Sequence, residues 1–138
     1  MTRSTSSIGQ IGEVAIMHRL MKHGWQVLIP YGNSAPYDLV AEQNGKIVRL
    51  QVRTTFAKSS SIRVNCRTKN NRVRINLESF DFLILYEFNS EIAFVIPRAE
   101  IMGKAAFFLR LSPSQSGQIK GTHSAIEYQE RWDKLYMV

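Results

Sequence analysis

The clearest pattern in the chain is an alternation of apolar and polar residues over positions 46–54, after a shorter extended run at positions 38–41. Such alternation is typical of a half-buried strand, with one face apolar and the other polar. The dipeptide Asn44-Gly45 lies between the two runs, and tight two-residue turns favour residues that adopt positive φ. The pattern predicts a β-hairpin in which Asp38, near the start of one strand, faces Gln51 and Arg53 on the other.

The remaining pattern predicts two helices and several more strands. Helical spacing over positions 8–23 predicts a first helix, capped by Ser6 or Ser7 and terminated by Gly24. Further strands are predicted at 25–29, 62–67, 72–77, 82–88, 92–96 and 107–111, and an amphipathic helix at 125–137 anchored by Ile126, Trp132 and Leu135. The runs 82–88 and 92–96 are almost continuously apolar, which favours the centre of a sheet.

Composition places the chain among ordinary soluble globular proteins. It has 138 residues, of which 44% are apolar and 21% charged, and no repeat or linker divides it, so we expect a single domain over residues 1–138. No apolar run approaches the roughly 18 residues of a membrane span. The first residues lack the apolar core of a signal peptide, and the single cysteine, Cys66, excludes an internal disulfide. We therefore expect a cytoplasmic protein with no membrane partner.

The positive charge is concentrated in one segment. The net charge is +7, and positions 46–74 hold nine basic residues and no acidic one, whereas the rest of the chain holds nine basic and eleven acidic residues. Such a segment indicates a polyanionic partner, and the plainer alternative is a solvated basic face with no partner. The residues expected to contact DNA are Arg49, Lys58, Arg63, Asn65, Arg67, Lys69, Arg72 and Arg74.

Within this segment, positions 62–67 and 72–77 resemble a second hairpin, joined by residues 68–71. Arg and Asn occupy one face of each strand and apolar residues the other. A two-stranded ribbon fits the DNA major groove, where Arg can bind guanine and Asn can bind adenine. The alternative is a ribbon that lies along phosphates without reading bases.

Three motifs in order resemble the PD-(D/E)XK nuclease superfamily, whose pattern is an acid on the first helix, an Asp, and then acid-any-Lys on the next strand. Here they are Glu13, Asp38 and Gln51-Val52-Arg53. The likeness covers nearly the whole chain. It is closest to small bacterial intron-encoded homing endonucleases, in which Gln replaces the acid of the last motif.

This resemblance implies an α+β (α/β) fold with a restriction-endonuclease-like core, a mixed central β-sheet flanked by helices, and a basic β-hairpin. It also implies a Mg²⁺ site, in which Mn²⁺ or Ca²⁺ could substitute. Asp38 would be the central ligand, the Gln51 amide oxygen a second and the Val52 carbonyl a third, with Glu13 at the rim. Arg53 would orient the attacking water or the phosphate.

Two residues depart from the superfamily pattern. Gln51 lacks the usual carboxylate, although an amide oxygen can still bind a hard cation. Arg53 replaces Lys and stays charged, so it cannot take part in proton transfer as a Lys can, although it can stabilise a phosphate.

The expected function is site-specific cleavage of double-stranded DNA by a metal-dependent, homing-type endonuclease. One active site per chain requires at least a homodimer to cut both strands, and the resemblance allows a homotetramer. Residues 112–122 and the C-terminal helix are candidate assembly surfaces. The alternatives are a Holliday-junction-resolvase-like, structure-selective nuclease, and a DNA-binding protein whose catalysis is weakened by Arg53.

Overall fold

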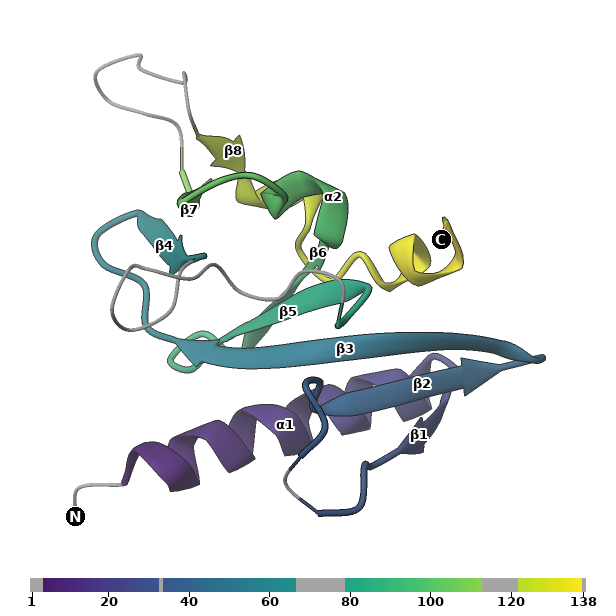
Figure 1. Cartoon of the computed structure of the whole chain (residues 1–138). Helices are drawn as coiled ribbons and strands as arrows, with labels where there is room; N and C mark the ends of the chain where they lie inside the picture. Colours follow the sequence, from purple (N-terminus) through teal and green to yellow (C-terminus); the bar gives the residue numbers. More distant parts are fainter. Residues whose placement is uncertain (1–3, 33, 67–78, 113–121, 138) are drawn as a thin grey trace.

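A five-stranded mixed sheet forms the framework of the computed structural model, which describes residues 4–32, 34–66, 79–112 and 122–137 (Figure 1). Its strand order is β1-β2-β3-β5-β6, and β3 and β5 form the parallel pair among otherwise antiparallel neighbours. The strands are β1 (Gln26–Leu28), β2 (Leu39–Gln43), β3 (Lys46–Thr55), β5 (Phe82–Glu87) and β6 (Ile92–Pro97). The mixed α+β architecture predicted from the sequence is confirmed.

The hairpin at the centre of the sequence pattern forms as predicted. Gln43 pairs with Lys46 across a two-residue turn, where Asn44 and Gly45 have φ values of 52° and 84°. Positive φ at both positions is what a tight hairpin turn requires. The turn fixes the register, so Leu39 pairs with Leu50 and both side chains enter the core.

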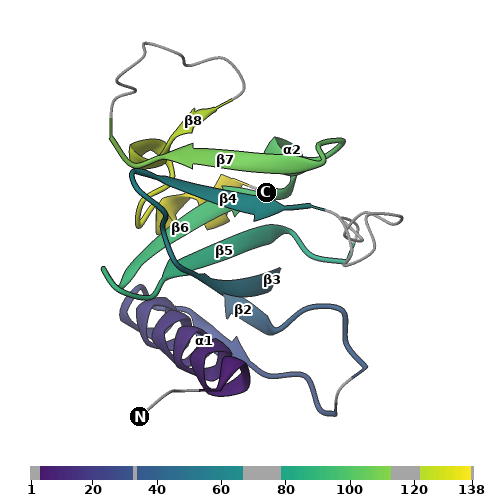
Figure 2. The same cartoon turned by 90° about the vertical axis from the view of Figure 1, so that its left-hand side faces the viewer.

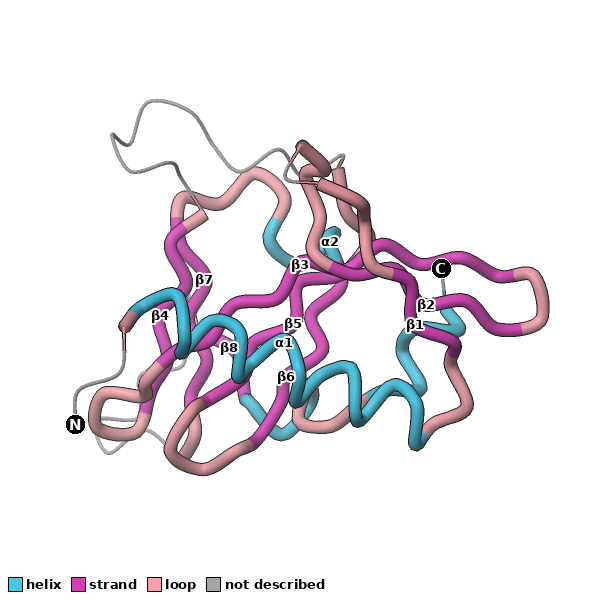
Figure 3. Tube along the Cα trace, turned by 90° about the horizontal axis from the view of Figure 1, so that it is seen from below, coloured by secondary structure: helices cyan, strands magenta, loops and turns pink. Residues whose placement is uncertain are grey.

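Helix α1 (Thr5–Lys22) covers one face of this sheet, as Figure 3 shows from below. Its N-cap is Ser4, whose hydroxyl oxygen accepts a hydrogen bond from the Ser7 amide at 3.1 Å, so the predicted cap at Ser6 or Ser7 is wrong. The helix therefore begins at Thr5, about one turn earlier than predicted, and the Ser4 cap satisfies a backbone amide of its first turn. Beyond the helix, Gly24 adopts a φ of 85°, as predicted.

A close contact between Gly12 and Thr54 sets how near α1 lies to β3. A Cβ atom added at Gly12 would overlap the Thr54 hydroxyl oxygen. The same hydroxyl donates to the Ile8 carbonyl at 3.4 Å. A residue without a side chain is therefore needed where the helix crosses the strand.

A second sheet of three strands, in the order β4-β7-β8, packs against the other face (Figure 2). It contains β4 (Ser61–Asn65), β7 (Ala106–Arg110) and β8 (His123–Ser124), and the short helix α2 (Arg98–Ile101) follows β6. β4 buries Ile62 and Val64 and exposes Arg63, as its alternation predicts. Its described neighbour is β7, whereas the whole of the predicted partner segment, 72–77, and all but the two end residues of the candidate assembly surface, 112–122, lie outside the described residues.

Strand β6 is an edge strand, so the prediction that both apolar strands are central is wrong for β6. It is buried because the C-terminal segment runs along its free edge. The Val95 amide donates to the Tyr128 carbonyl at 2.9 Å, and the Glu130 amide donates to the Ala93 carbonyl at 2.8 Å. This cover satisfies the backbone groups of an edge that water would otherwise have to satisfy.

The predicted C-terminal helix is also wrong, because the segment forms two short 3₁₀ helices, η1 (Ala125–Glu127) and η2 (Trp132–Met137). Between them Glu130 adopts a φ of 50°, which interrupts any continuous helix. Trp132 and Leu135 are buried as predicted, but Ile126 is 69% exposed and anchors nothing in the described structure.

Candidate active site

Glu13 and Asp38 line one cavity of about 280 Å³ beside the start of β2. The rest of its wall comes from the segment between β1 and β2 and consists of Ile29, Pro30, Gly32, Ala35 and Tyr37. Two carboxylates from distant parts of the sequence therefore share one hollow, and the helix supplies one while the strand entrance supplies the other.

The backbone of β3 fixes the position of Asp38. The Asp38 amide donates to the Leu50 carbonyl at 2.9 Å, and the Val52 amide donates to Asp38 Oδ2 at 2.8 Å. The register of β2 and β3, continued by one residue beyond Leu39 and Leu50, sets Asp38 opposite Gln51. The sequence prediction that Asp38 lies against this part of the neighbouring strand therefore agrees with the geometry.

Glu13 reaches this place because α1 lies so close to β3 at the preceding residue, Gly12. Burial, and next the negative charge of Asp38, raise the pKa of the Glu13 carboxyl group above its ordinary value. A like charge nearby disfavours ionisation of a carboxyl group, and a bound cation would relieve that cost. The electrostatics therefore fit a cation site at this point.

The donor set suits a hard divalent cation that keeps several waters. Among the described residues no group of three or more His, Cys, Asp or Glu side chains could hold a metal ion. Any protein ligand added to the two carboxylates would then be an amide or backbone oxygen, and Gln51 and Val52 are the residues next to Asp38 on β3. Oxygen ligands with retained water are characteristic of Mg²⁺.

Arg53 lies on the same strand but is held by the second sheet. Its Nη1 donates to the Asn65 carbonyl, at the end of β4, at 2.8 Å. Burial lowers the pKa of Arg53, while the nearby Cys66 and Asp38 act in the opposite direction. The guanidinium thus lies near Asp38 and is bonded to the end of β4, and its other N–H groups can serve a phosphate.

The described basic residues differ in how far their charge is already neutralised. Arg49 pairs with Asp81, with Nη2 to Oδ1 at 3.3 Å and the Arg49 amide to Oδ2 at 2.8 Å. Arg63 is exposed on β4, with its guanidinium carbon 5.9 Å from the centre of the Phe108 ring, and Lys58 is exposed at the turn before β4. The other four predicted DNA contacts, Arg67, Lys69, Arg72 and Arg74, lie outside the described residues.

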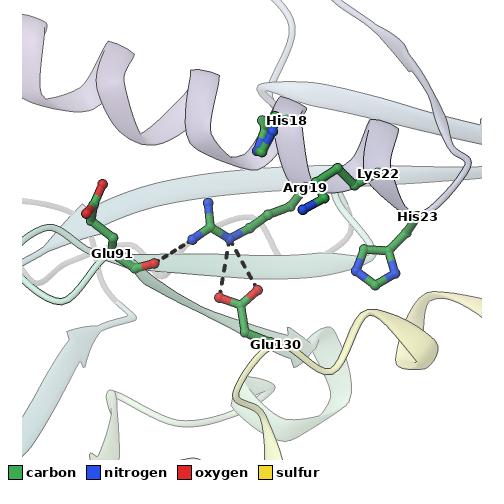
Figure 4. Close-up of a pocket in the computed structure, with 6 residues that line it drawn as sticks. All are labelled: His18, Arg19, Lys22, His23, Glu91 and Glu130. Atoms are coloured by element: carbon green, nitrogen blue, oxygen red, sulfur yellow. Dashed lines mark hydrogen bonds and ion pairs between the residues drawn. The ribbon is translucent and has the colours of Figure 1, made fainter.

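A second, larger cavity of about 470 Å³ lies on the other side of α1 (Figure 4). It contains a carboxylate, Glu130, that already has hydrogen-bond partners within the protein. Glu130 accepts from Arg19 Nε at 3.2 Å, from the Ala93 amide at 2.8 Å and from Trp132 Nε1 at 2.9 Å. Arg19 also donates to the Glu91 carbonyl. This network ties α1 to β6 and the C-terminal segment, which is a structural role.

The neutral wall of the Glu13–Asp38 cavity could not be predicted from the sequence pattern. Ile29 and Pro30 follow β1 and were assigned to strand and loop, with no chemical signal to mark them. Tyr37 stands directly before Asp38, and this adjacency is the one sequence signal that could have placed it at the site.

A mixed sheet with one helix on its face, and a carboxylate pair where that helix meets the strand entrance, defines the restriction-endonuclease-like class. Residues 3–133 match the family model described as PD-(D/E)XK endonuclease. The chain belongs to this family.

Two solved structures resemble the chain. The bacterial homing endonuclease I-Ssp6803I is 26% identical with a TM-score of 0.78, over 98% of this chain and 95% of its own. Hjc, a Holliday junction resolvase from the archaeal hyperthermophile Archaeoglobus fulgidus, is 13% identical with a TM-score of 0.51, over 74% of this chain and 83% of its own. The second likeness concerns the fold alone.

No match was found among curated proteins. Among the described helices, none combines the length and the apolar character that crossing a bilayer requires.

Proposed function

We propose that the chain is a single-domain, metal-dependent endonuclease that cuts double-stranded DNA at a specific site, as a homing enzyme does. One observation carries the proposal: Glu13 and Asp38 share a cavity, burial and the charge of Asp38 raise the pKa of Glu13, and Asp38 lies opposite Gln51 and near Arg53. The family match and the likeness to I-Ssp6803I over almost the whole chain support the same reading. Because its substrate is DNA, we place the enzyme in the cytoplasm.

The proposed roles follow from the positions of the side chains. Asp38 is the central ligand of Mg²⁺, for which Mn²⁺ or Ca²⁺ can substitute, and the Gln51 amide and the Val52 carbonyl complete the protein ligands. Glu13 lies at the rim. A bound divalent cation lowers the pKa of a water molecule and neutralises charge that develops on the phosphate.

The remaining steps belong to the protein itself. The Val52 amide holds Asp38 in place, so the carboxylate does not have to reorganise when substrate arrives. Arg53 contributes a fixed positive charge for the scissile phosphate or for orienting the water, and one of its N–H groups stays on Asn65. An Arg cannot act as the base, so the proton of the attacking water must pass to an acceptor other than Arg53.

Binding of DNA is assigned to the basic segment. Arg49, Lys58, Arg63 and Asn65 are the described members of the set, and Arg67, Lys69, Arg72 and Arg74 complete it. Cleavage of both DNA strands with one active site per chain requires a homodimer or a homotetramer.

A structure-selective nuclease is the second candidate, because Hjc shares this fold. A third possibility is a DNA-binding protein in which the Arg53 substitution has weakened catalysis.

One experiment distinguishes the three. The protein is incubated with Mg²⁺ and either a library of randomised linear duplexes or a four-way junction, and the cleaved ends are sequenced, with Asp38→Asn as the control for contaminating nucleases. Cleavage of duplexes at one shared sequence is the expected result. Cutting confined to junctions would support the second candidate, and salt-sensitive binding without Mg²⁺-dependent cleavage the third.

A further inference from the structure

The segment between β1 and β2 leads directly into the candidate active site. Positions 24–37 contain no Asp, Glu, Lys, Arg or His, and the next residue is Asp38. Two large side chains of this uncharged segment are open to solvent, since Ile29 is 66% exposed and Tyr31 is fully exposed. The carboxylates of the site therefore stand next to exposed apolar side chains.

The same cavity joins these side chains to the carboxylates. Ile29 lines the hollow of about 280 Å³ that Glu13 and Asp38 also line, and the residues on both sides of Tyr31 line it as well. In Figure 2 the segment between β1 and β2 lies on the right, which is also the side where β4 ends. Because Arg53 is bonded to the end of β4, the segment and Arg53 belong to the same side of the molecule.

The backbone that carries the exposed side chains has little freedom. Pro30 fixes its own φ and disfavours the helical conformation at Ile29. Gly32 adopts a φ of 80°, which turns the chain directly after Tyr31. A side chain on a restricted backbone loses less conformational entropy when a ligand binds, so the Tyr31 ring can contact a substrate at a small entropic cost.

We propose that Tyr31 and Ile29 form an apolar contact with the sugar and base of a nucleotide next to the scissile phosphate. The inference rests on the proposed function, which places that phosphate at the cation beside Asp38. The sugar is bonded to the phosphate, so it must lie against the wall of the cavity. Positions 24–37 supply no Lys or Arg for a further phosphate, whereas an aromatic ring stacks on any base.

DNA is favoured over a second protein as the occupant, because the exposed side chains are continuous with the cavity in which the substrate reacts. Such a contact acts without charge. Contacts from Lys and Arg to phosphates release counterions and make binding depend on salt, but packing of a ring does not. Loss of the Tyr31 ring should therefore weaken binding by the same factor at low and at high salt.

The first test measures binding of duplex DNA by fluorescence anisotropy over a range of salt concentrations, in EDTA so that the DNA stays intact. Tyr31→Ala should raise Kd by about 10- to 100-fold, the size of one base–aromatic contact, with an unchanged salt slope. Tyr31→Phe keeps the ring and should bind as wild type does. An unchanged Kd for Tyr31→Ala, or a loss accompanied by a smaller salt slope, would overturn the proposal.

Ile29→Ser should also weaken binding, and Ile47→Ser is its matched control. Ile47 is 65% exposed, nearly the same as Ile29, but it lies on β3 six residues before Arg53, roughly 20 Å along the strand. Its replacement should leave Kd unchanged. Equal losses in Ile29→Ser and Ile47→Ser would mean that the effect does not belong to the cavity wall, which would overturn the role of Ile29.

A second test locates the contact. A photoreactive benzophenone amino acid replaces Tyr31 or, as the control, Ile47, and each protein is irradiated in complex with duplex DNA. Position 31 should crosslink to the nucleotides on either side of the cut, and position 47 should not. Crosslinks from position 31 only to a second protein chain, or only to DNA away from the cut, would overturn the proposal.

Failure of this contact and failure of the nuclease function give different results. A wild type that cleaves, together with a Tyr31→Ala protein that binds and cleaves equally well, would refute the contact and leave the nuclease standing. A wild type that binds DNA without cleaving it, and loses binding on Tyr31→Ala, would refute the nuclease and leave the DNA contact standing.

Discussion

Two carboxylate clusters lie on opposite sides of α1, and they differ in what surrounds them. Glu130 has an Arg partner and two further N–H donors, one from the Ala93 backbone and one from Trp132. Glu13 faces another carboxylate, Asp38, and burial and that charge both raise the pKa of its carboxyl group. One cluster is complete within the protein, and the other has charges that an external cation would balance.

The difference between the two clusters indicates which cavity of this fold is the better candidate for a catalytic site. The larger cavity contains Arg19 and Glu130, which already bind each other and neighbouring groups, so its size alone is not a sign of function. The smaller cavity holds Glu13, whose carboxyl pKa is raised, together with a second carboxylate, Asp38, and a perturbed carboxyl group in a cleft is typical of a functional site. Four predictions, in order of decreasing effect, test this contrast.

Asp38→Asn should reduce Mg²⁺-dependent cleavage by about 10³-fold or more, equivalent to about 4 kcal/mol, because it removes the central anionic ligand. The Val52 amide can still donate to the amide oxygen, so the fold and DNA binding should persist. Single-turnover cleavage and a gel-shift assay measure the two properties. Wild-type cleavage by the variant would remove Asp38 from the metal role.

Glu13→Gln should reduce cleavage by about 10- to 100-fold, which is the size expected of a residue that supports a metal site from its rim. The loss should shrink as the Mg²⁺ concentration rises, because the weaker site can be filled by mass action. A Mg²⁺ titration of the cleavage rate measures this. If the rate stays low at saturating Mg²⁺, Glu13 acts on the reaction itself and not through the cation.

Glu130→Gln should leave cleavage unchanged and lower the free energy of unfolding by about 1–2 kcal/mol, since a neutral amide weakens charge-assisted hydrogen bonds to Arg19 and to two other donors. Urea unfolding measures the change. Glu127→Gln is the matched control, because Glu127 is exposed on the adjacent η1, and its stability should match wild type. A catalytic defect in Glu130→Gln would mean that the two clusters are coupled.

The smallest effect concerns pH in the metal-free protein. The folded-state pKa of Glu13 lies above its ordinary value of 4.5, so the folded chain holds this proton more tightly than the unfolded chain. As pH rises above 4.5, wild type should therefore lose stability relative to Glu13→Gln until the folded-state pKa is passed. Unfolding in EDTA at several pH values measures the difference.

Added Mg²⁺ should reverse that trend, because the cation favours the deprotonated form of Glu13 and stabilises the fold more once Glu13 has ionised. A difference between the two proteins that does not change with pH in EDTA would contradict the assigned environment of Glu13.

The features that the sequence predicted well are those fixed by local rules. The Asn44-Gly45 turn determines the register of β2 and β3, and that register alone brings Asp38 to Gln51. The alternation within β4 likewise predicted which side chains are buried, including Cys66 next to its end. These features depend on residues that are close together in the sequence, so the local sequence pattern is enough to predict them.

The features that the sequence missed depend on distant segments. The spacing of Trp132 and Leu135 predicted a helix, but the backbone of the C-terminal segment instead forms hydrogen bonds with the free edge of β6. A local sequence pattern cannot predict a contact with a distant strand. The bond from Arg53 to the Asn65 carbonyl joins two sheets. The position of Glu13 depends on the fit of Gly12 against a strand about forty residues later.

The fit of Gly12 against Thr54 also limits how this site can change in evolution or in the laboratory. A methyl group at position 12 would push the helix off the strand and carry Glu13 away from Asp38, even though neither acidic residue had mutated. A smaller residue at position 54 could restore the spacing. A library randomised at both codons and selected for cleavage should therefore return the two positions as correlated choices.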